Sequence, residues 1–493
     1  MRNDDRCQQS RLDTPGILNL DLNLESRHEL VPLLRGLQVL YADQESRRLA
    51  LEYVRTDVLG KASKNRGRPG LDLWSIVVLA AARLGLDLDY DELQDLAENH
   101  RNVRAAMGIG DWQTRTRLDW RLIRDTVCKV TPETLDKINR LIVALGHQRV
   151  PEAAERVRID SFVLGTNIHY PTDIRQTGDA LRCLIRHGAR LGEVIGSTTL
   201  RQHEHLQRRS RSLVLSASRA SASHGRGQQQ RREQTVRELV DFANDRSNQS
   251  LGLLAEAQAR MADLDDFARS AALAERSKMM WFLTALAQVA DVAKRRLVDG
   301  EDIPLADRLF SVFEAHSELI VRGKVPQPVE FGHRILTAED LAGFIVHYHV
   351  MANGRQDRDV ATTVTRLLKR EYPELQSVSF DRGFHSPENQ QRLAELIPEP
   401  CLPTTGFKAA AAQNEAASEA WHVARRRHPG IESAIGALQA GNGCTRCRDR
   451  TKLGYRRYAA LAILSRNLLT LGRIDIAQKE GAVLAGRSRR QAS

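Results

Sequence analysis

The sequence contains no apolar run long enough to cross a membrane. Its mean hydropathy is −0.41, and none of its apolar segments reaches the roughly 18 to 20 residues that a bilayer-spanning helix needs. The chain also lacks an apolar signal core behind its polar first residues, Met1 to Asp5. We therefore expect a soluble, cytoplasmic protein with no membrane partner.

The sequence also lacks the cysteine pattern of a disulfide-bonded protein, and it shows no internal repeat. Its six cysteines are mostly scattered along the chain. Only Cys444 and Cys447 are close together, and the upstream His422 and His428 do not complete a recognised pattern of zinc ligands. We favour two reduced thiols in a turn, and a structural zinc site is the alternative.

Basic residues exceed acidic residues, and the excess is concentrated in one region. The formal net charge is +11, and residues 201–240 contain nine arginines against three glutamates. A polyanionic partner, with nucleic acid as the first candidate, is the simplest explanation. The alternatives are a basic protein without such a partner and, for this region, a basic disordered loop.

The length of 493 residues predicts two to four domains. Residues 1–28 are polar and irregular, as expected of a flexible arm, whereas residues 29–150 have the apolar spacing of a helical DNA-binding domain. Residues 176–325 are mostly helical in pattern, with a flexible basic loop at 208–232. Residues 476–493 are expected to form a disordered tail.

Short apolar runs predict a mixed α/β layer in the remaining parts of the chain, 151–175 and 326–475. The helical insertion separates the first expected strand from the others, which alternate with helices. The expected strands are Val157 to Leu164, Val329 to Leu336, Gly343 to Met351, Ser377 to Asp381 and a short strand near Cys401.

Three carboxylates occupy positions suited to a metal site. Asp160 lies inside the first strand, Asp381 follows a later strand, and Glu432 lies in the first turn of a helix. Each has an ordinary alternative, namely a strand-end aspartate facing water, a turn aspartate, and a glutamate favoured by the helix dipole. Together they match the Asp-Asp-Glu arrangement of enzymes with RNase H-like nucleotidyl transfer activity. Carboxylates suit this chemistry, because hard cations such as Mg²⁺ prefer oxygen ligands.

The segments around these carboxylates share motifs with a known enzyme family. The segments are residues 160–163, 167–173, 330–333, 379–389, 432–438, 454–461 and 466–468, with the helical region 67–96. They resemble bacterial insertion-sequence DDE transposases of the ISNCY type, and the resemblance covers roughly residues 30–475. Gln176, Thr177 and Gln439 depart from the family pattern, which tends to have two leucines and a basic residue at these positions.

The resemblance implies an RNase H-like catalytic domain, interrupted by the helical insertion, in which Asp160, Asp381 and Glu432 hold Mg²⁺, with Mn²⁺ able to substitute. It implies cleavage of double-stranded DNA at the terminal inverted repeats of a mobile element and joining of the freed ends to target DNA. It also implies a homo-oligomer in the synaptic complex and a nucleoid-associated location. The alternatives are a decayed, non-catalytic DNA-binding protein and an RNase H-like nuclease that does not join strands.

Several basic residues are candidates for contact with DNA. The basic linker that contains Lys64, Arg66 and Arg68 could lie in a minor groove or be a solvated loop. Arg456 and Arg457, which follow the third motif, could bind phosphates or lie on a solvated face. Histidines that recur in the motifs are expected near DNA or metal by the resemblance, and hydrogen-bonded structural histidines are the alternative. These residues are Lys64, Arg66, Arg68, Arg456, Arg457, His169, His333 and His385.

Overall fold

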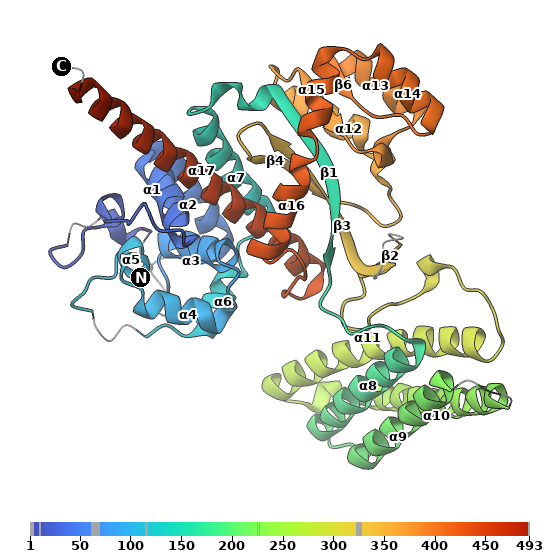
Figure 1. Ribbon diagram of the computed structural model, residues 1–493. Coiled ribbons are helices and arrows are strands. Elements are labelled where there is room, and N and C mark those ends of the chain that lie inside the picture. The colour runs from blue at the N-terminus through green and yellow to red at the C-terminus, as the bar shows by residue number, and fades with distance from the viewer. Residues whose placement is uncertain are drawn as a thin grey trace. The chain divides into compact units, whose positions relative to one another are not determined.

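Helices and one mixed sheet form the α/β fold that the sequence patterns predict (Figure 1). The computed structural model describes residues 4–8, 11–60, 70–113, 117–223, 225, 227–321 and 328–491. The chain divides into two units: we call Met1–Thr166 with His333–Ser493 the sheet unit, and Asn167–Gly332 the helical unit. Across the described ranges, no helix combines the length and apolar character needed to cross a bilayer.

Where the structure describes it, the chain forms seven α-helices before the sheet, and side-chain caps begin most of them. Asp89 and Glu92 form a reciprocal capping box, and Thr131 caps the last of these helices, whose first residue is Pro132. Such caps satisfy backbone N–H groups that have no partner inside the helix. The helices are α1 (Leu30–Ala42), α2 (Gln44–Leu59), α3 (Leu73–Gly85), α4 (Tyr90–Asn99), α5 (Arg101–Ala106), α6 (Trp120–Val127) and α7 (Pro132–His147).

The sheet contains both parallel and antiparallel pairs. The strands are β1 (Arg156–Gly165), β2 (Glu318–Val321), β3 (Val329–Asp340), β4 (Ile345–Val350), β5 (Ser377–Phe380) and β6 (Glu399–Cys401). Their order is β2-β3-β1-β5-β6, and β4 also pairs with β3. β5 is parallel to both β1 and β6, whereas β2 and β4 are antiparallel to β3. β3 crosses the unit boundary: residues 329–332 pair with β2 in the helical unit, and later residues pair with β4 in the sheet unit.

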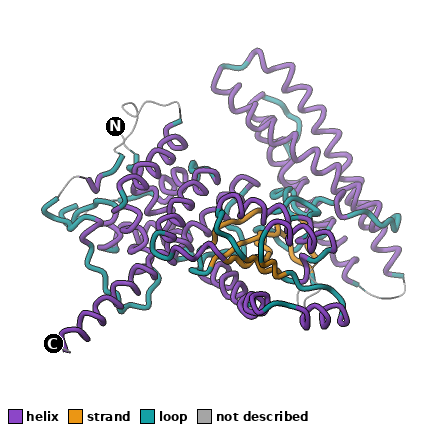
Figure 2. Tube along the Cα trace, turned by 90° about the horizontal axis from the view of Figure 1, so that it is seen from above, coloured by secondary structure: helices purple, strands orange, loops and turns teal. Residues whose placement is uncertain are grey.

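Further helices of the sheet unit follow β4 and are interleaved with the last strands. They are α12 (Ala361–Glu371), α13 (Pro387–Leu396), α14 (Phe407–Ala416), α15 (Glu419–Arg427), α16 (Gly430–Gly441) and α17 (Thr451–Gln491). Figure 2 shows the strands gathered in one place with helices around them. All four residues of β5 are buried, as expected for a strand that is covered on both faces.

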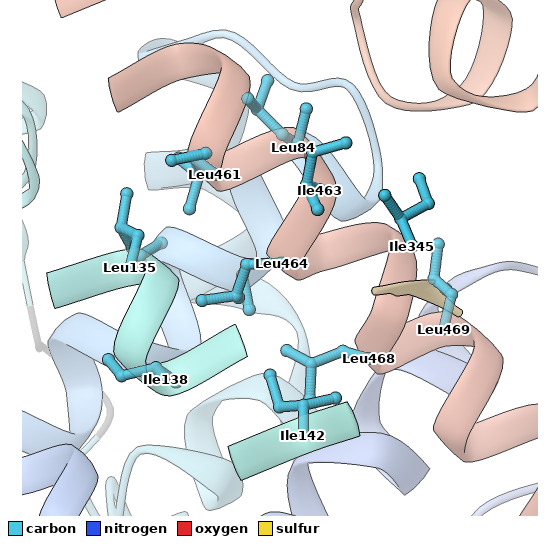
Figure 3. Close-up of a cluster of buried hydrophobic side chains, with 14 of the residues drawn as sticks. Leu84, Leu135, Ile138, Ile142, Ile345, Leu461, Ile463, Leu464, Leu468 and Leu469 are labelled. Carbon is cyan, nitrogen blue, oxygen red and sulfur yellow. The ribbon is translucent and has the colours of Figure 1, made fainter. Parts of the chain in front are cut away.

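The long helix α17 joins the amino-terminal helices to the sheet in one apolar core. Its leucines and isoleucines pack against side chains of α3, α7 and β4 (Figure 3). α17 also lies very close to α1, because Gly36 and Gly472 leave no side chain between the two helices. The residues expected to form a separate helical domain, 29–150, therefore belong to the same compact unit as the sheet.

The described parts of both terminal segments include packed or helical residues. In the expected flexible arm, Ile17 is buried and the Tyr41 hydroxyl donates to the carboxylate of Asp5 at 2.7 Å. In the expected disordered tail, 476–493, α17 continues to Gln491. The polar composition of these segments did not predict that they pack against the core or continue a helix.

The helical unit contains four long helices around a core of its own. The helices are α8 (Asp173–Ile195), α9 (His203–Ala222), α10 (Gln228–Arg260) and α11 (Asp266–Leu297). The side chain of Thr172 caps the start of α8, and Gly196 ends it in the left-handed conformation. The predicted insertion, 176–325, falls within this unit. Most of the predicted flexible loop, 208–232, is instead helical, because it belongs to α9 and α10.

Candidate functional site

Two of the predicted metal ligands lie on neighbouring parallel strands. Ile159 of β1 pairs with Phe380 of β5, and the residues that follow these two are Asp160 and Asp381. Asp381 continues the extended backbone of β5, with φ −81° and ψ 166°. Since paired strands lie about 4.8 Å apart, the two aspartates are side by side in the backbone.

The two aspartates are on the face of the sheet that meets the junction of α15 and α16. Arg158 and Ser379 precede them by two positions and therefore share their face. The Ser379 hydroxyl is 3.1 Å from Nδ1 of His428, and the Arg158 guanidinium donates to the carbonyl of Arg427 at 3.1 Å. His428 and Arg427 are the residues that join α15 to α16.

α16 carries the third predicted ligand, Glu432, and lies beside β1 (Figure 1). Its first residue is Gly430, where a Cβ atom would collide with the Arg158 guanidinium. Glu432 follows His428 by four residues, and His428 and Pro429 have helical backbone angles between the two helices, so Glu432 lies about one turn beyond His428 along the chain. The side chain of Glu432 is exposed at the edge of the buried surface of α16.

The two aspartates differ in exposure, and the histidine beside them is neutral. Asp160 is half-buried and its carboxylate accepts a hydrogen bond from the backbone N–H of Ser161 at 2.7 Å, while Asp381 is exposed. Burial, reinforced by the nearby Arg425, lowers the pKa of His428 to about 4, although the charge of Asp381 acts in the opposite direction. His428 is therefore neutral at pH 7 and contributes no positive charge beside Asp381.

The structure does not bring all three carboxylates into one tight group. Among the residues that it describes, no three His, Cys, Asp or Glu side chains form a cluster that could hold a metal ion. The predicted triad consists of two adjacent aspartates, set by the register of β1 and β5, and a glutamate on the flanking helix.

The motif histidines of the sheet unit have different surroundings. His385 is half-buried, and its Nδ1 is 3.4 Å from the hydroxyl of Thr405. His333 is buried, its ring packs edge-on against Tyr455 with centroids 5.0 Å apart, and its backbone N–H donates to the Tyr455 hydroxyl. The position of His333 fits the alternative of a structural histidine, whereas His385 is accessible in part.

The predicted basic contacts also differ from one another. Arg456 is exposed and forms an ion pair with Glu133 at 2.9 Å. Arg457 is buried and donates to Asp449 and to the backbone carbonyl of Cys128, so it holds the protein together and does not face a ligand. Lys64, Arg66 and Arg68 lie outside the described residues.

Three residues that position the site were not identified from the sequence. Arg158, Ser379 and His428 connect the sheet to the start of α16. Arg158 also pairs with the buried Glu339 at 2.5 Å. The alternation of side chains along β1 and β5 would have placed Arg158 and Ser379 on the face of the aspartates, but their partners come from a distant segment.

Comparison with protein-family models, with curated proteins and with solved structures finds no match to this chain. Its function must therefore be argued from its motifs and from the geometry of the site.

Proposed function

We propose that this protein is a DNA transposase that cleaves the ends of an insertion sequence and joins them to target DNA by metal-dependent phosphoryl transfer. The observation that carries the proposal is the placement of Asp160 and Asp381 at adjacent positions of two parallel strands. Both face the helix that bears Glu432.

The sheet supports an RNase H-like catalytic domain. β1 has β5 and then β6 on one side, in parallel, and β3 followed by β4 on the other. This is the strand order expected of an RNase H-like sheet, with the helical unit inserted between β1 and β3. In α/β sheets, ligands bind outside the carboxyl ends of the parallel strands, and Asp381 follows such an end directly.

The donor atoms of the three carboxylates suit Mg²⁺, because this ion prefers oxygen ligands and is held by few protein carboxylates. Asp160, Asp381 and Glu432 would hold it, and Mn²⁺ is expected to substitute. When bound, the ion would lower the pKa of a water and stabilise the leaving oxygen of the phosphodiester. The exposure of Asp381 and Glu432 leaves this face open to a DNA strand.

The other residues of the site keep the carboxylates in position. Neutral His428 can bond to Ser379 at pH 7, and this bond connects the end of β5 to the start of α16. Gly430 allows α16 to begin against Arg158 of β1, and Glu432 lies in the first turn of that helix. Both terminal inverted repeats would be held in a synapse of two or more copies of the chain.

The proposal is tested by Asp381→Asn in the full-length protein. We expect cleavage and joining of element-end DNA in Mg²⁺ to fall at least about 1,000-fold, because a charged ligand that acts in the transition state is removed. Binding to the same DNA should change little, since most affinity comes from phosphate contacts elsewhere. Gel assays of nicked and joined products and anisotropy with labelled duplex measure the two quantities.

Glu395→Gln is the matched control, because Glu395 is an exposed carboxylate on α13 of the sheet unit and lies outside the motif segments. It should leave both activities unchanged. Full cleavage by the Asp381→Asn protein would refute the assigned site. Cleavage without joined products would identify a nuclease, and binding without cleavage by the unaltered protein would identify a non-catalytic DNA-binding protein.

A further inference from the structure

One side of α9 in the helical unit carries a row of exposed arginines. Arg208, Arg211 and Arg219 are all exposed, and their spacing places them within about 80° of one another around the helix. We call these three residues the α9 row. With a rise of 1.5 Å per residue, the row spans about 16 Å from Arg208 to Arg219.

Among the described residues, no acidic side chain forms an ion pair with the α9 row. Within the described part of the helical unit, the three arginines form no ion pair, whereas other arginines of the unit do. Arg296 pairs with Asp173, and Arg182 pairs with Asp179 at 2.9 Å. Like charges that share a face repel one another, so an anionic partner would stabilise this surface.

A hollow of about 450 Å³ lies beside the row, between α8 and α9. Arg175 and Arg182 of α8 and Arg211 of α9 line it. The helices approach closely below it, because Gly178 has no side chain where Val214 packs. Arg211 belongs both to the row and to the hollow, and the exposed Arg175 adds a positive charge to the hollow, where Asp179 pairs with Arg182.

We propose that the α9 row and this hollow bind the phosphate backbone of double-stranded DNA. Arginine suits this role, because its planar fork of N–H donors can bond to two phosphate oxygens at once. A membrane surface fits less well, because Leu215 is the only large apolar side chain that α9 exposes among the described residues. The choice of DNA over other polyanions rests on the proposed function.

The test removes the row from the full-length protein by combining Arg208→Gln, Arg211→Gln and Arg219→Gln. The control combines Arg48→Gln, Arg392→Gln and Arg426→Gln, which make the same change in net charge at exposed ion pairs of the sheet unit. Affinity for a 30-base-pair duplex of arbitrary sequence is measured by anisotropy over a series of NaCl concentrations.

We expect the slope of log affinity against log salt to become shallower by about 2.7 in the row variant, since each phosphate contact contributes about 0.9. Affinity at low salt should fall about 10-fold or more, and the control should change the slope by less than about 1. An unchanged slope in the row variant, or an equal change in the control, would overturn the proposal.

Two outcomes separate this inference from the proposed function. If cleavage depends on Asp381 but DNA affinity is the same with and without the α9 row, only the proposed DNA-binding surface on α9 is refuted. Row-dependent DNA binding without Asp381-dependent cleavage would refute only the transposase. A protein that binds vesicles rich in phosphatidylserine and no duplex DNA would refute both.

Discussion

In the sheet unit, Arg83 and Arg457 are buried and both bond to Asp449, whereas in the helical unit the α9 row faces solvent without acidic partners among the described residues. Both groups consist of arginines, but their guanidinium groups have different roles. A buried arginine that shares a carboxylate fixes the packing around it, and an exposed arginine without a carboxylate presents its charge to a partner.

The comparison shows that an excess of basic residues does not by itself locate a DNA surface. Arg457 follows a sequence motif and looked like a phosphate contact, but its charge is neutralised inside the protein. The α9 row lies in a segment whose composition indicated a loose loop. Only the fold distinguishes an arginine that is used internally from one that is available to bind.

The largest effect on stability is expected from Asp449→Asn. Arg83 and Arg457 contact Asp449 at 2.6 Å and 3.1 Å, and all three side chains are at most 10% exposed. The variant leaves two buried guanidinium groups without their counter-ion, which should lower the free energy of unfolding by about 3–5 kcal/mol. Thermal and urea unfolding followed by circular dichroism measure the change.

The matched control is Glu45→Gln, which removes a partner of Arg48 on the surface of the same unit. Both of those side chains are more than half exposed, so the loss should stay below about 1 kcal/mol. Equal effects of the two variants would show that Asp449 is not a structural counter-ion and that the contrast between buried and exposed arginines is unfounded.

The strands that carry the site were largely predictable, because their apolar runs are short and continuous. β1 was expected at 157–164 and occupies Arg156–Gly165. β3 was expected to end at Leu336 but continues to Asp340, since its last residues include acids that do not look like a buried strand. Glu339 and Asp340 can be buried there because Arg158 and His147 pair with them. Those partners are far away in the sequence.

The helix α9 was not predictable from its polar, serine-rich composition. Its alanines Ala217 and Ala220 are buried against the core of the helical unit, and tertiary packing of this kind stabilises helices whose sequence is ambiguous. At the candidate site, the sequence predicted the carboxylates but not the contacts that orient their surroundings. The bond between Ser379 and His428 joins residues of two separate elements, and no local pattern encodes it.

Gly472 of the sheet unit and Gly252 of the helical unit differ in the space around them, and alanine substitutions measure the difference. A Cβ atom at Gly472 of α17 would collide with the backbone carbonyl of Pro32 in α1, whereas one at Gly252 of α10 would meet open space. Gly472→Ala should therefore lower the free energy of unfolding by about 2–3 kcal/mol through overpacking. Gly252→Ala should raise it by about 0.5–1 kcal/mol, because alanine favours the helix.

Differential scanning calorimetry of both variants, compared with the unaltered protein, tests this contrast. A higher melting temperature for the Gly252→Ala protein and a lower one for the Gly472→Ala protein are expected. Tolerance of alanine at Gly472 would mean that α1 and α17 can separate at little cost, and that the core of the sheet unit is less constrained than the close approach implies.

A further predicted effect is the pH dependence that His428 gives to the sheet unit. Its pKa is lowered to about 4 by burial, assisted by the charges of Arg425 and Arg158 and opposed by Asp381. The unfolded chain takes up a proton near pH 6.5, so folding stability from this residue is complete above pH 6.5 and declines as the pH falls toward 4. Between pH 7 and pH 5 the loss should be about 2 kcal/mol.

His428→Gln tests this prediction, because glutamine can still bond to Ser379 but does not titrate. The melting temperature of the variant should fall less between pH 7 and pH 5 than that of the unaltered protein, while other buried histidines contribute equally to both. His422→Gln, on the preceding helix and only half-buried, is the control. If both variants lose stability with pH as the unaltered protein does, His428 is not held neutral by burial. The imidazole that connects β5 to α16 would then become charged below about pH 6.5, which would bring a positive charge beside Asp381 and weaken cation binding there at mildly acidic pH.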